Sequence, residues 1–583
     1  MKHFFTSLCI MIILQFSLYA QTIVNVPSDP PGSSGSLNNA IQSAIDGGTL
    51  SSTVFNLEQY GYYVLSGWIE IPLNQHLQIT GPDPGTTQNE ALPQIVWTAD
   101  NSVNTDYFFR CFGDLSMKNV WLRYANEGGV QKGSQIRFIG DTLGTAEVRG
   151  NFDDVIFDYS PCPSVNASGS VTVTATHFVG HFKNCYWKNC IDTHLRYYGR
   201  AVSFPYQSTK WHIDSLTFEN CTFANMGYVY MQEESEFGDN VHFNHCTFLN
   251  VMVHTLESGQ WYKMSVTNSL LVNTQMFGRR PVDGDSVSGG LITNIDSIVN
   301  FSRPETATFG EQDRRILLAN DSYGIQPWLV DWMANSPWAK YLHSLRRDDE
   351  IPEPCAMLNP ATLEFLNSTD FPYMNQSNLY DGVLPRFVLP PTATDSLKTF
   401  LNKKWDDNSD INWAFQRDDG YFQTWPLPED LSYANDTLKT AAMGGFPLGD
   451  LYRWWPDQYA LWKAQENDEY NRIYTWLETG TDPGAVDVRE VKGFAPSVYK
   501  LSQNYPNPFN PTTRIEYSVP KSGYVSLRVY NLLGQEVATL FSGNQKAGNY
   551  VATFNGSDLA SGVYMYKLQS DKVSITKKFV LMK

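Results

Sequence analysis

The sequence has few charged residues, and among them too few basic ones for general binding to polyanions. Asp, Glu, Lys and Arg make up 17% of the 583 residues, with 42 Lys+Arg against 60 Asp+Glu. The resulting net charge of −18 disfavours a general affinity for nucleic acid or anionic membranes. Gly and Pro, at 41 and 31 residues, are not enriched, which excludes collagen-like and low-complexity chains. The 14% of aromatic residues indicates a β-rich protein.

Long apolar runs are also scarce. The run from Phe4 to Tyr19 follows Lys2 and His3 and precedes the small-residue position Ala20. It is shorter than the roughly 20 residues that a membrane-spanning helix needs. We therefore expect residues 1–20 to be a secretory signal peptide and the mature chain to have no transmembrane segment.

Cysteines and cofactor motifs are equally few. Seven of the eight cysteines lie beyond the apolar run, too few for a disulfide scaffold in a chain of this length. The sequence contains no phosphate-binding Gly-rich loop, zinc-protease helix motif or Gly-Xaa-Ser-Xaa-Gly elbow. No cofactor or metal is therefore indicated, and Ca²⁺, although chemically possible, has no motif to support it.

An internal repeat is present. Four segments align without gaps, at spacings of 36, 25 and 23 residues: Cys185–Asn189, Cys221–Asn225, Cys246–Asn250 and Ser269–Asn273. Asn tolerates a left-handed bend, and its amide can pair with an Asn above and below. The small first residues then form an inward stack, which favours a structural thiol ladder over a metal site or disulfides. Coils of this length are typical of one rung of a β-solenoid.

The N-terminal region supports the same architecture. Apolar spacing predicts a short helix from Leu37 to Ile45 with Ser36 as its N-cap, followed by strands at Tyr62–Leu65, Trp68–Ile71 and Leu77–Thr80. This order, with its Ala-Ile-Gln-Ser-Ala-Ile-Asp and Leu-Gln-Ile-Thr-Gly strings, resembles the entry of pectin-lyase-like right-handed β-helices. The predicted fold class is mainly β, with a right-handed parallel β-helix over residues 21–300.

The strand after each Asn of the repeat predicts one face of the solenoid. Alternation sends every second residue outward, and the polar and aromatic set is the one we assign to the outside. One predicted row contains His194, Tyr230 and Thr255. The next contains Arg196, Gln232, Glu257 and Arg280.

Such a face suits an extended polysaccharide, because aromatic rings can stack on sugars beside cations and carboxylates. The resemblance to β-helix polysaccharide lyases implies a base at His194 or Arg196 and a carboxylate clamp at Arg280. Asp192 and Glu257 could instead form a glycosidase pair. The predicted catalytic residues are His194, Arg196, Glu257 and Arg280. The predicted substrate-binding residues are Asp192, Tyr228, Tyr230 and Gln232.

Three interpretations of this face remain open: catalysis, glycan binding without chemistry, and a structural surface. The lyase string Arg-Xaa-Pro-Xaa-Xaa-Arg is incomplete, since it begins at Arg279 and Gly284 occupies its last position. The sequence therefore does not decide whether the protein is an enzyme.

Residues 301–480 form a different, aromatic-rich region. Ten of the sixteen tryptophans lie between Trp328 and Trp476. Helical patterning covers Trp328–Leu345, Ser396–Trp405 and Tyr459–Trp476. Tryptophans can form sugar-stacking surfaces, but we expect these helices mainly to pack on the flank of the β-helix or to extend it.

After a linker at 481–500, short alternating segments predict a small immunoglobulin-like β-sandwich. The six expected strands are Ile515–Val519, Val525–Tyr530, Val537–Leu540, Tyr550–Phe554, Val563–Leu568 and Val573–Leu581. The strings Gln503-Asn-Tyr-Pro-Asn-Pro-Phe-Asn-Pro, Val529-Tyr-Asn-Leu-Leu-Gly-Gln-Glu-Val and Leu559-Ala-Ser-Gly-Val-Tyr occur in order. Together they resemble a type A C-terminal sorting domain of the type IX secretion system over residues 501–583. This resemblance implies the type IX machinery as a partner, and secretion or display on the outer cell surface.

The charge divides unevenly along the chain. Residues 501–583 carry 9 Lys+Arg and 4 Asp+Glu, a net charge of +5, whereas residues 21–500 carry a net charge of −24. A region this acidic, residues 21–500, which we call the cargo, repels polyuronates. We therefore expect a neutral glycan as the ligand. We expect a secreted or cell-surface protein that binds or degrades extracellular polysaccharide, as a lyase or glycoside hydrolase if it is an enzyme. The alternative is a non-catalytic surface structural or adhesion protein.

Overall fold

The computed structural model describes most of the chain after residue 20. The described residues are 21–85, 90–97, 107–124, 134–141, 146–160, 169–191, 199–205, 213–232, 238–257, 261–284, 289–292, 310–403, 413, 415, 424–483, 489–491, 498–556, 559–570 and 573–582. The predicted signal peptide and the predicted site residues Asp192, His194 and Arg196 lie outside them.

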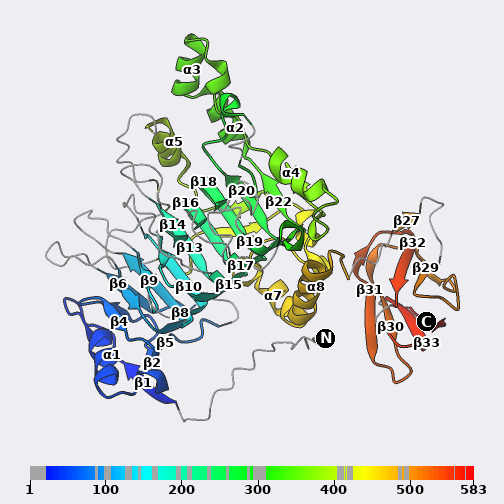
Figure 1. The fold of residues 1–583 in the computed structure, drawn as a ribbon, viewed down its shortest axis with the longest axis horizontal. Helices are drawn as coiled ribbons and strands as arrows, with labels where there is room; N and C mark the ends of the chain where they lie inside the picture. Colours follow the sequence, from blue (N-terminus) through cyan, green and yellow to red (C-terminus); the bar gives the residue numbers. More distant parts are fainter. Residues whose placement is uncertain are drawn as a thin grey trace.

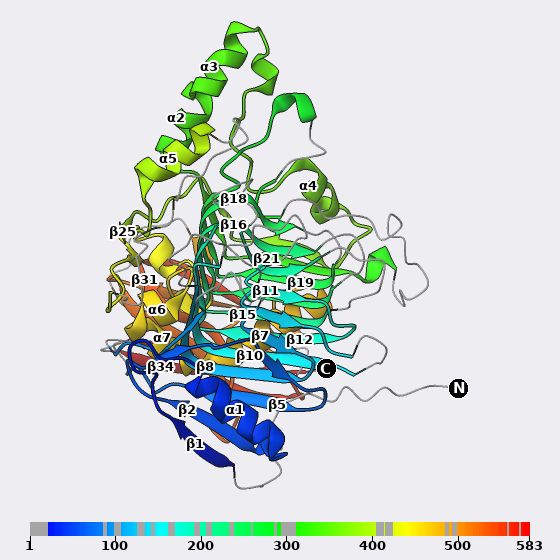
Figure 2. The same ribbon diagram turned by 90° about the vertical axis from the view of Figure 1, so that its left-hand side faces the viewer.

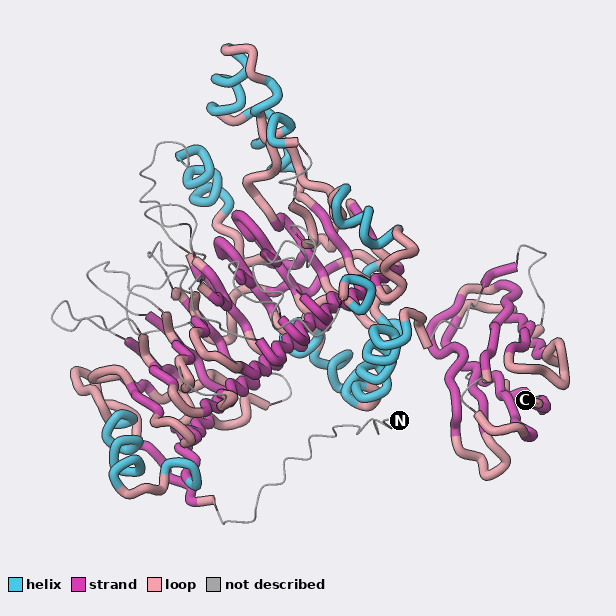
Figure 3. Tube along the Cα trace, in the orientation of Figure 1, coloured by secondary structure: helices cyan, strands magenta, loops and turns pink. Residues whose placement is uncertain are grey.

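The described residues of the cargo, residues 21–500, contain one 24-stranded sheet whose strands pair in parallel (Figure 1, Figure 3). Its strands form three ladders. The first contains β1 (Thr22–Val26), β2 (Thr53–Leu57), β5 (His76–Thr80), β8 (Asp114–Tyr124), β10 (Val148–Asp158), β12 (Phe178–Lys183), β15 (Ile213–Glu219), β17 (Gly238–Asn244), β19 (Trp261–Thr267), β21 (Arg315–Ala319) and β23 (Met374–Ser377).

The other two ladders complete each turn of the chain. The second contains β3 (Tyr62–Val64), β6 (Gln94–Trp97), the ends of β8 and β10, β13 (Tyr186–Cys190), β16 (Thr222–Gln232), β18 (Thr247–Glu257), β20 (Leu270–Thr274), β22 (Ser322–Gly324) and β24 (Tyr380–Asp381). The third contains β4 (Ile69–Ile71), β7 (Phe109–Cys111), β9 (Ile136–Phe138), β11 (Val171–Val173), β14 (Arg200–Phe204) and the ends of β16 and β18. The sheet thus continues beyond residue 300, the predicted end of its domain.

The predicted repeat register is confirmed. Thr222 pairs with Tyr186 and with Thr247, and Thr247 pairs with Leu270, so the four repeat segments lie directly above one another. The three predicted N-terminal strands agree with β3, β4 and β5 to within one residue.

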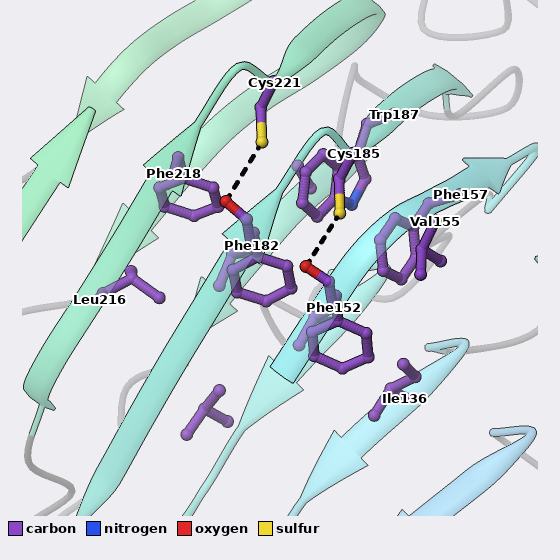
Figure 4. Close-up of a cluster of buried hydrophobic side chains, with 14 of the residues drawn as sticks. Ile136, Phe152, Val155, Phe157, Phe182, Cys185, Trp187, Leu216, Phe218 and Cys221 are labelled. Atoms are coloured by element: carbon purple, nitrogen blue, oxygen red, sulfur yellow. Dashed lines mark hydrogen bonds between the residues drawn. The ribbon is translucent and has the colours of Figure 1, made fainter. Parts of the chain in front are cut away.

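Two stacks of aromatic rings fill the interior. Phe152, Phe182, Phe218 and Phe243 form one stack, with centroid separations of 4.8, 5.1 and 4.6 Å. Phe157, Trp187, Phe223 and Phe248 form the other, at 4.5, 4.9 and 5.2 Å. Neighbouring rings in each stack are nearly parallel and several are visible in Figure 4. Identical register on each rung lets rings of one kind stack at the spacing of the strands.

The predicted thiol ladder is confirmed. Cys185, Cys221 and Cys246 are buried and free of disulfides. Their Sγ atoms donate to the carbonyl oxygens of Phe152, Phe182 and Phe218, at 3.7, 3.4 and 3.6 Å. Figure 4 shows the first two of these bonds. Burial raises the pKa of the Cys185 and Cys221 thiols.

Helix α1 (Ser36–Asp46) lies at the N-terminal end of the strand stack (Figure 2). Leu37, Ile41 and Ala44 are its buried residues, as the apolar spacing predicts. The predicted N-cap is wrong, because Gly35 is the N-cap, with φ of 93°, and Ser36 is the first helical residue. A left-handed conformation at this position suits Gly better than Ser.

The aromatic-rich region contains seven short helices and one antiparallel strand pair among its described residues. The helices are α2 (Pro327–Asn335), α3 (Pro337–Ser344), α4 (Pro360–Asn367), α5 (Thr394–Lys403), α6 (Leu451–Trp454), α7 (Pro456–Lys463) and α8 (Glu466–Thr479). The strands are β25 (Phe387–Leu389) and β26 (Asp430–Tyr433). The predicted helix at Trp328–Leu345 is split into α2 and α3 where Ser336 caps α3.

These helices cover the sheet. Leu431, Trp454 and Trp462 pack on the outer residues of the second ladder, such as Tyr186 and Leu249. Helix α8 packs Ile473 and Trp476 on Leu317 and Ala319 of β21. Helices α2, α3 and α5 lie together at the end of the stack remote from α1 (Figure 2).

The C-terminal region forms two four-stranded antiparallel sheets with a common core. One contains β27 (Arg489–Val491), β32 (Gly548–Asn555), β29 (Thr512–Val519) and β28 (Lys500–Leu501). The other contains β31 (Glu536–Gln545), β30 (Gly523–Tyr530), β33 (Gly562–Ser570) and β34 (Ser574–Leu581). All six strands expected after residue 514 are present.

Candidate functional site

The predicted outward row at Tyr230 is wrong. Tyr230 is fully buried, and its ring packs on Phe204 and Trp261, with centroids 6.0 and 6.4 Å away. It pairs with Val202 on β14 and Leu256 on β18, and not with Thr255. The cause is a register shift between the two strands: Met226 pairs with Val251 but Tyr228 pairs with His254, so β18 contains one more residue than β16 over this stretch. Tyr230 therefore falls opposite Leu256 and faces the interior.

The same shift breaks the second predicted row. Glu257, the last residue of β18, pairs with Met231 instead of Gln232, which pairs with Phe204. Arg280 lies outside the ladders, just before the turn Pro281–Asp283. Its Nε and Nη2 donate to the Asp283 carboxylate at 2.8 and 2.7 Å. The row Gln232, Glu257 and Arg280 is therefore not formed.

Tyr228 is 7% exposed and belongs to a column of polar rings. It pairs with Arg200 on β14 and His254 on β18. The Arg200 guanidinium lies 5.0 Å from the Tyr228 centroid, and the His254 ring lies 5.7 Å from it on the other strand. Burial lowers the pKa of His254 to about 4. At this exposure Tyr228 offers little surface to a sugar ring.

A different site is organised by the four repeat asparagines, which we call the asparagine column: Asn189, Asn225, Asn250 and Asn273. All four have left-handed φ values between 53° and 59°. From Asn225 onward, each amide Nδ2 donates to the Oδ1 of the preceding Asn, at 3.4, 3.0 and 3.0 Å along the column. The predicted bend and side-chain pairing are therefore both confirmed.

The asparagine column also fixes the segments that cover it. Asn225 Nδ2 donates to the carbonyl oxygen of Pro391 at 2.6 Å, and Asn250 Nδ2 donates to Thr392 Oγ1 at 2.9 Å. Asn273 Nδ2 donates to Gln326 Oε1 at 2.7 Å. Pro391 and Thr392 precede α5, and Gln326 is the N-cap of α2. The corners at Asn225 and Asn250 thus position α5, and the next corner, at Asn273, positions α2.

A pocket of about 250 Å³ lies between these two helices. Its lining residues are Trp328, Asp331, Trp332, Asn335, Ser336, Pro337, Lys398 and Asn402. Trp332 is nearly buried, and its Nε1 donates to Asn402 Oδ1 at 2.8 Å. Trp328 is half-buried, and its Nε1 donates to Gln326 Oε1, also at 2.8 Å. Both indoles are thus held by hydrogen bonds at their polar ends, which leaves apolar ring surface for packing.

The polar groups of the pocket balance one another. Lys398 Nζ lies 5.6 Å from the Trp328 centroid, within the range of a cation–π contact. The exposed Asp331 accepts from Asn335 Nδ2 at 2.9 Å. One cation, one carboxylate and two carboxamides give a site with no net charge and both donors and acceptors.

Sequence reasoning missed this pocket, although part of its signal is visible. Trp328 and Trp332 are four residues apart, as are Lys398 and Asn402, so each pair lies on one helix face. What joins the two faces is the asparagine column, and that connection depends on tertiary structure.

A second corner of the sheet holds the flank segment, residues 441–454. Arg453 Nη2 donates to Asp154 Oδ1 at 2.6 Å, and both side chains are 3% exposed. Asp450 Oδ2 accepts from Thr222 Oγ1 at 2.7 Å, and the Leu451 backbone N–H donates to Asn220 Oδ1 at 3.2 Å. Many aromatic residues of this region therefore have a structural role, because Trp454 and its neighbours cover the outer side of the sheet.

No cluster of three or more His, Cys, Asp or Glu that could hold a metal ion occurs within the described residues. In the same part of the chain, none of the helices is both long and apolar enough to cross a membrane.

Comparison with known proteins identifies the C-terminal region. Residues 503–582 match the family model described as a secretion system C-terminal sorting domain. Searches of curated proteins and of solved structures found no match to the chain. The sorting domain directs the protein through the type IX system to the outer cell surface, as the sequence motifs predict.

Proposed function

We propose that this exported protein is a right-handed parallel β-helix that binds a neutral glycan between α2 and α5, followed by an immunoglobulin-like sorting domain. The three parallel ladders with left-handed corners support the β-helix, and the two antiparallel sheets with one core support the sandwich. The pocket lined by Trp328, Trp332, Lys398 and Asn402 is the observation that carries the binding function.

The chemistry of the pocket suits a sugar ring. A sugar presents an apolar face of C–H groups and a rim of hydroxyls that both donate and accept. The half-buried Trp328 ring supplies a flat apolar surface, while Asp331, Asn335, Lys398 and Asn402 supply the polar rim. A volume near 250 Å³ accommodates about one ring, with the rest of a chain extending into solvent.

Charge favours a neutral ligand. The cargo, residues 21–500, carries a net charge of −24, and the pocket itself has no net charge to offset that field. Binding is also favoured over catalysis, because Tyr230 and Arg280, two members of the predicted outward face, do not share a surface.

The experiment is a binding screen of the secreted protein against neutral and acidic polysaccharides, by affinity electrophoresis and then calorimetry. Trp328→Ala should weaken binding at least tenfold, equivalent to about 1.4 kcal/mol. Trp338→Ala is the matched control, since Trp338 is half-buried on α3 beside Tyr341 and does not line the pocket. Equal binding by both variants, or binding of acidic glycans alone, would contradict the proposal.

A further inference from the structure

The sorting domain has an apolar end that its own fold leaves uncovered. Leu532 and Leu533 are 69% and 83% exposed in the turn between β30 and β31, and Met582 is 54% exposed after β34. Val563 on β33 is 38% exposed. An exposed cluster of large apolar side chains on a secreted domain marks an interaction site.

Strand register brings these residues together. Tyr530 pairs with Met565, and Val563 pairs with Val580, so the ends of β30, β33 and β34 lie side by side. The turn that carries Leu532 and Leu533 follows Tyr530 directly, and Met582 follows β34. We call this surface the apolar end of the tail: Leu532, Leu533, Val563, Met565, Val580 and Met582.

The turn is built to hold its leucines outward. Asn531 Oδ1 accepts from the backbone N–H groups of Leu533 and Gln535, both at 3.0 Å, and Asn531 Nδ2 donates to Gln535 Oε1 at 2.8 Å. Gly534 supplies the left-handed residue, with φ of 79°. A turn fixed in this way presents two apolar side chains with little conformational entropy left to lose on binding.

The apolar end lies away from the cargo connection. Lys500, where the chain enters β28, pairs with Ser518 near the end of β29, and Val491 pairs with Asn549 near the start of β32. The apolar end lies at the opposite ends of the strands, beside Phe509, which bridges to Leu581. A partner can therefore contact it without displacing the chain that joins the tail to the cargo.

Basic residues border this surface. Lys578 pairs with Met565, and Lys567 lies two residues further along β33 on the same face. Residues 501–583 carry a net charge of +5, opposite in sign to the cargo. The chemistry that complements this surface is an apolar socket with an acidic rim.

From this arrangement we propose that the apolar end of the tail is the surface by which a protein component of the type IX outer-membrane apparatus recognises this chain. The inference rests on the export role of residues 503–582, within which all six of its residues fall. The occupant is a protein component and not a lipid surface, because the cluster is small, rigid and set on one end of a folded domain.

The test uses the full chain in its native host, with the surface-displayed fraction measured by labelling of intact cells. Leu532→Ser/Leu533→Ser should lower that fraction at least tenfold and raise the periplasmic fraction, while Leu532→Met/Leu533→Met keeps it. Met582→Ser tests the same surface from another strand. Val498→Ser, at an exposed apolar residue near the cargo connection, is the matched control and should be displayed normally.

Each outcome decides a different claim. Protease resistance of the tail checks that each variant is folded, which we expect because the mutated side chains make few contacts. Normal display of both the double Ser variant and Met582→Ser would overturn the recognition surface. Normal display after deletion of residues 501–583 would instead overturn the export role itself. Loss of display in Val498→Ser as well would show that general tail stability, and not this surface, is being measured.

Discussion

Asn273 and Gln326 form a reciprocal pair: Asn273 Nδ2 donates to Gln326 Oε1 at 2.7 Å, and the Gln326 backbone N–H donates to Asn273 Oδ1 at 2.8 Å. Gln326 Oε1 also accepts from Trp328 Nε1 at 2.8 Å. The last residue of the asparagine column therefore sets both the start of α2 and the orientation of the pocket tryptophan.

We predict that Asn273→Gly lowers the affinity for the glycan strongly and the stability of the fold only moderately. Gly keeps the left-handed backbone but removes the amide, which should lower the free energy of unfolding by roughly 1–3 kcal/mol. The control is Asn268→Gly, at a left-handed corner that contacts Met443 and neither α2 nor α5. Calorimetry and thermal unfolding of both variants separate the two effects. An equal loss of affinity in the control would contradict the prediction.

Arg453→Met should destabilise the cargo by about 3–5 kcal/mol, because it leaves the Asp154 carboxylate buried without its cation. Burial already raises the pKa of Asp154, and the Arg453 charge opposes that rise. Adding Asp154→Asn should restore much of the loss, since Asn is neutral and tolerates the φ of 52° at this corner. Chemical denaturation measures both variants, and a fully additive double variant would rule out coupling between the two side chains.

Stability should fall between pH 4 and pH 7 through Asp450. Burial raises the pKa of Asp450 from its ordinary 3.8 to about 7, although Arg453 and Thr222 oppose the rise. The folded protein then holds a proton that the unfolded chain releases, so this group favours folding at low pH and loses that effect as pH rises.

Asp450→Asn should therefore flatten the pH profile of the free energy of unfolding between pH 4 and pH 7. The difference in free energy of unfolding between the variant and the wild type should be smaller at pH 7 and above than at pH 4. Asp436→Asn is the control, because the Asp436 side chain is 94% exposed. Equilibrium denaturation at several pH values gives the profile. A slope unchanged from the wild type would contradict the assignment to Asp450.

The thiols of Cys185 and Cys221 should not react with alkylating reagents in the folded protein. Both are fully buried, and burial raises their pKa values, so the reactive thiolate is scarce and inaccessible. Mass spectrometry after brief alkylation, native and denatured, measures the labelling at each position. Rapid labelling of either in the native state would show that the interior rungs open.

The strand register could be predicted from sequence where one residue type repeats at every corner. Asn189, Asn225, Asn250 and Asn273 mark the corner because a left-handed bend selects Asn, and small residues four positions earlier mark the interior. Counting onward from the corner failed at Tyr230, because β18 has one more residue between Val251 and His254 than β16 has between Met226 and Tyr228, and this difference leaves no compositional signal.

The pocket could not be predicted for a different reason. Trp328 and Lys398 belong to separate helices, and only the stacking of Asn250 and Asn273 brings Thr392 and Gln326 into adjacent positions. Helical periodicity predicts which side of α2 and α5 is apolar, but not which third element both helices contact. In the sorting domain, by contrast, strands and turns are local, and alternation predicts all of the strands after residue 514.

The flank segment changes how the stacked rungs respond to stress. In an unbraced solenoid each rung contacts only its neighbours, so unfolding can begin at one end and spread. Here Arg453, Leu451 and Met443 bond to corners at Asp154, Asn220 and Asn268, which belong to different rungs. Opening any one of these rungs therefore breaks contacts with the same flank segment. The central cargo should therefore unfold in a single cooperative step. Proteases at the cell surface then find no partly unfolded intermediate to cleave.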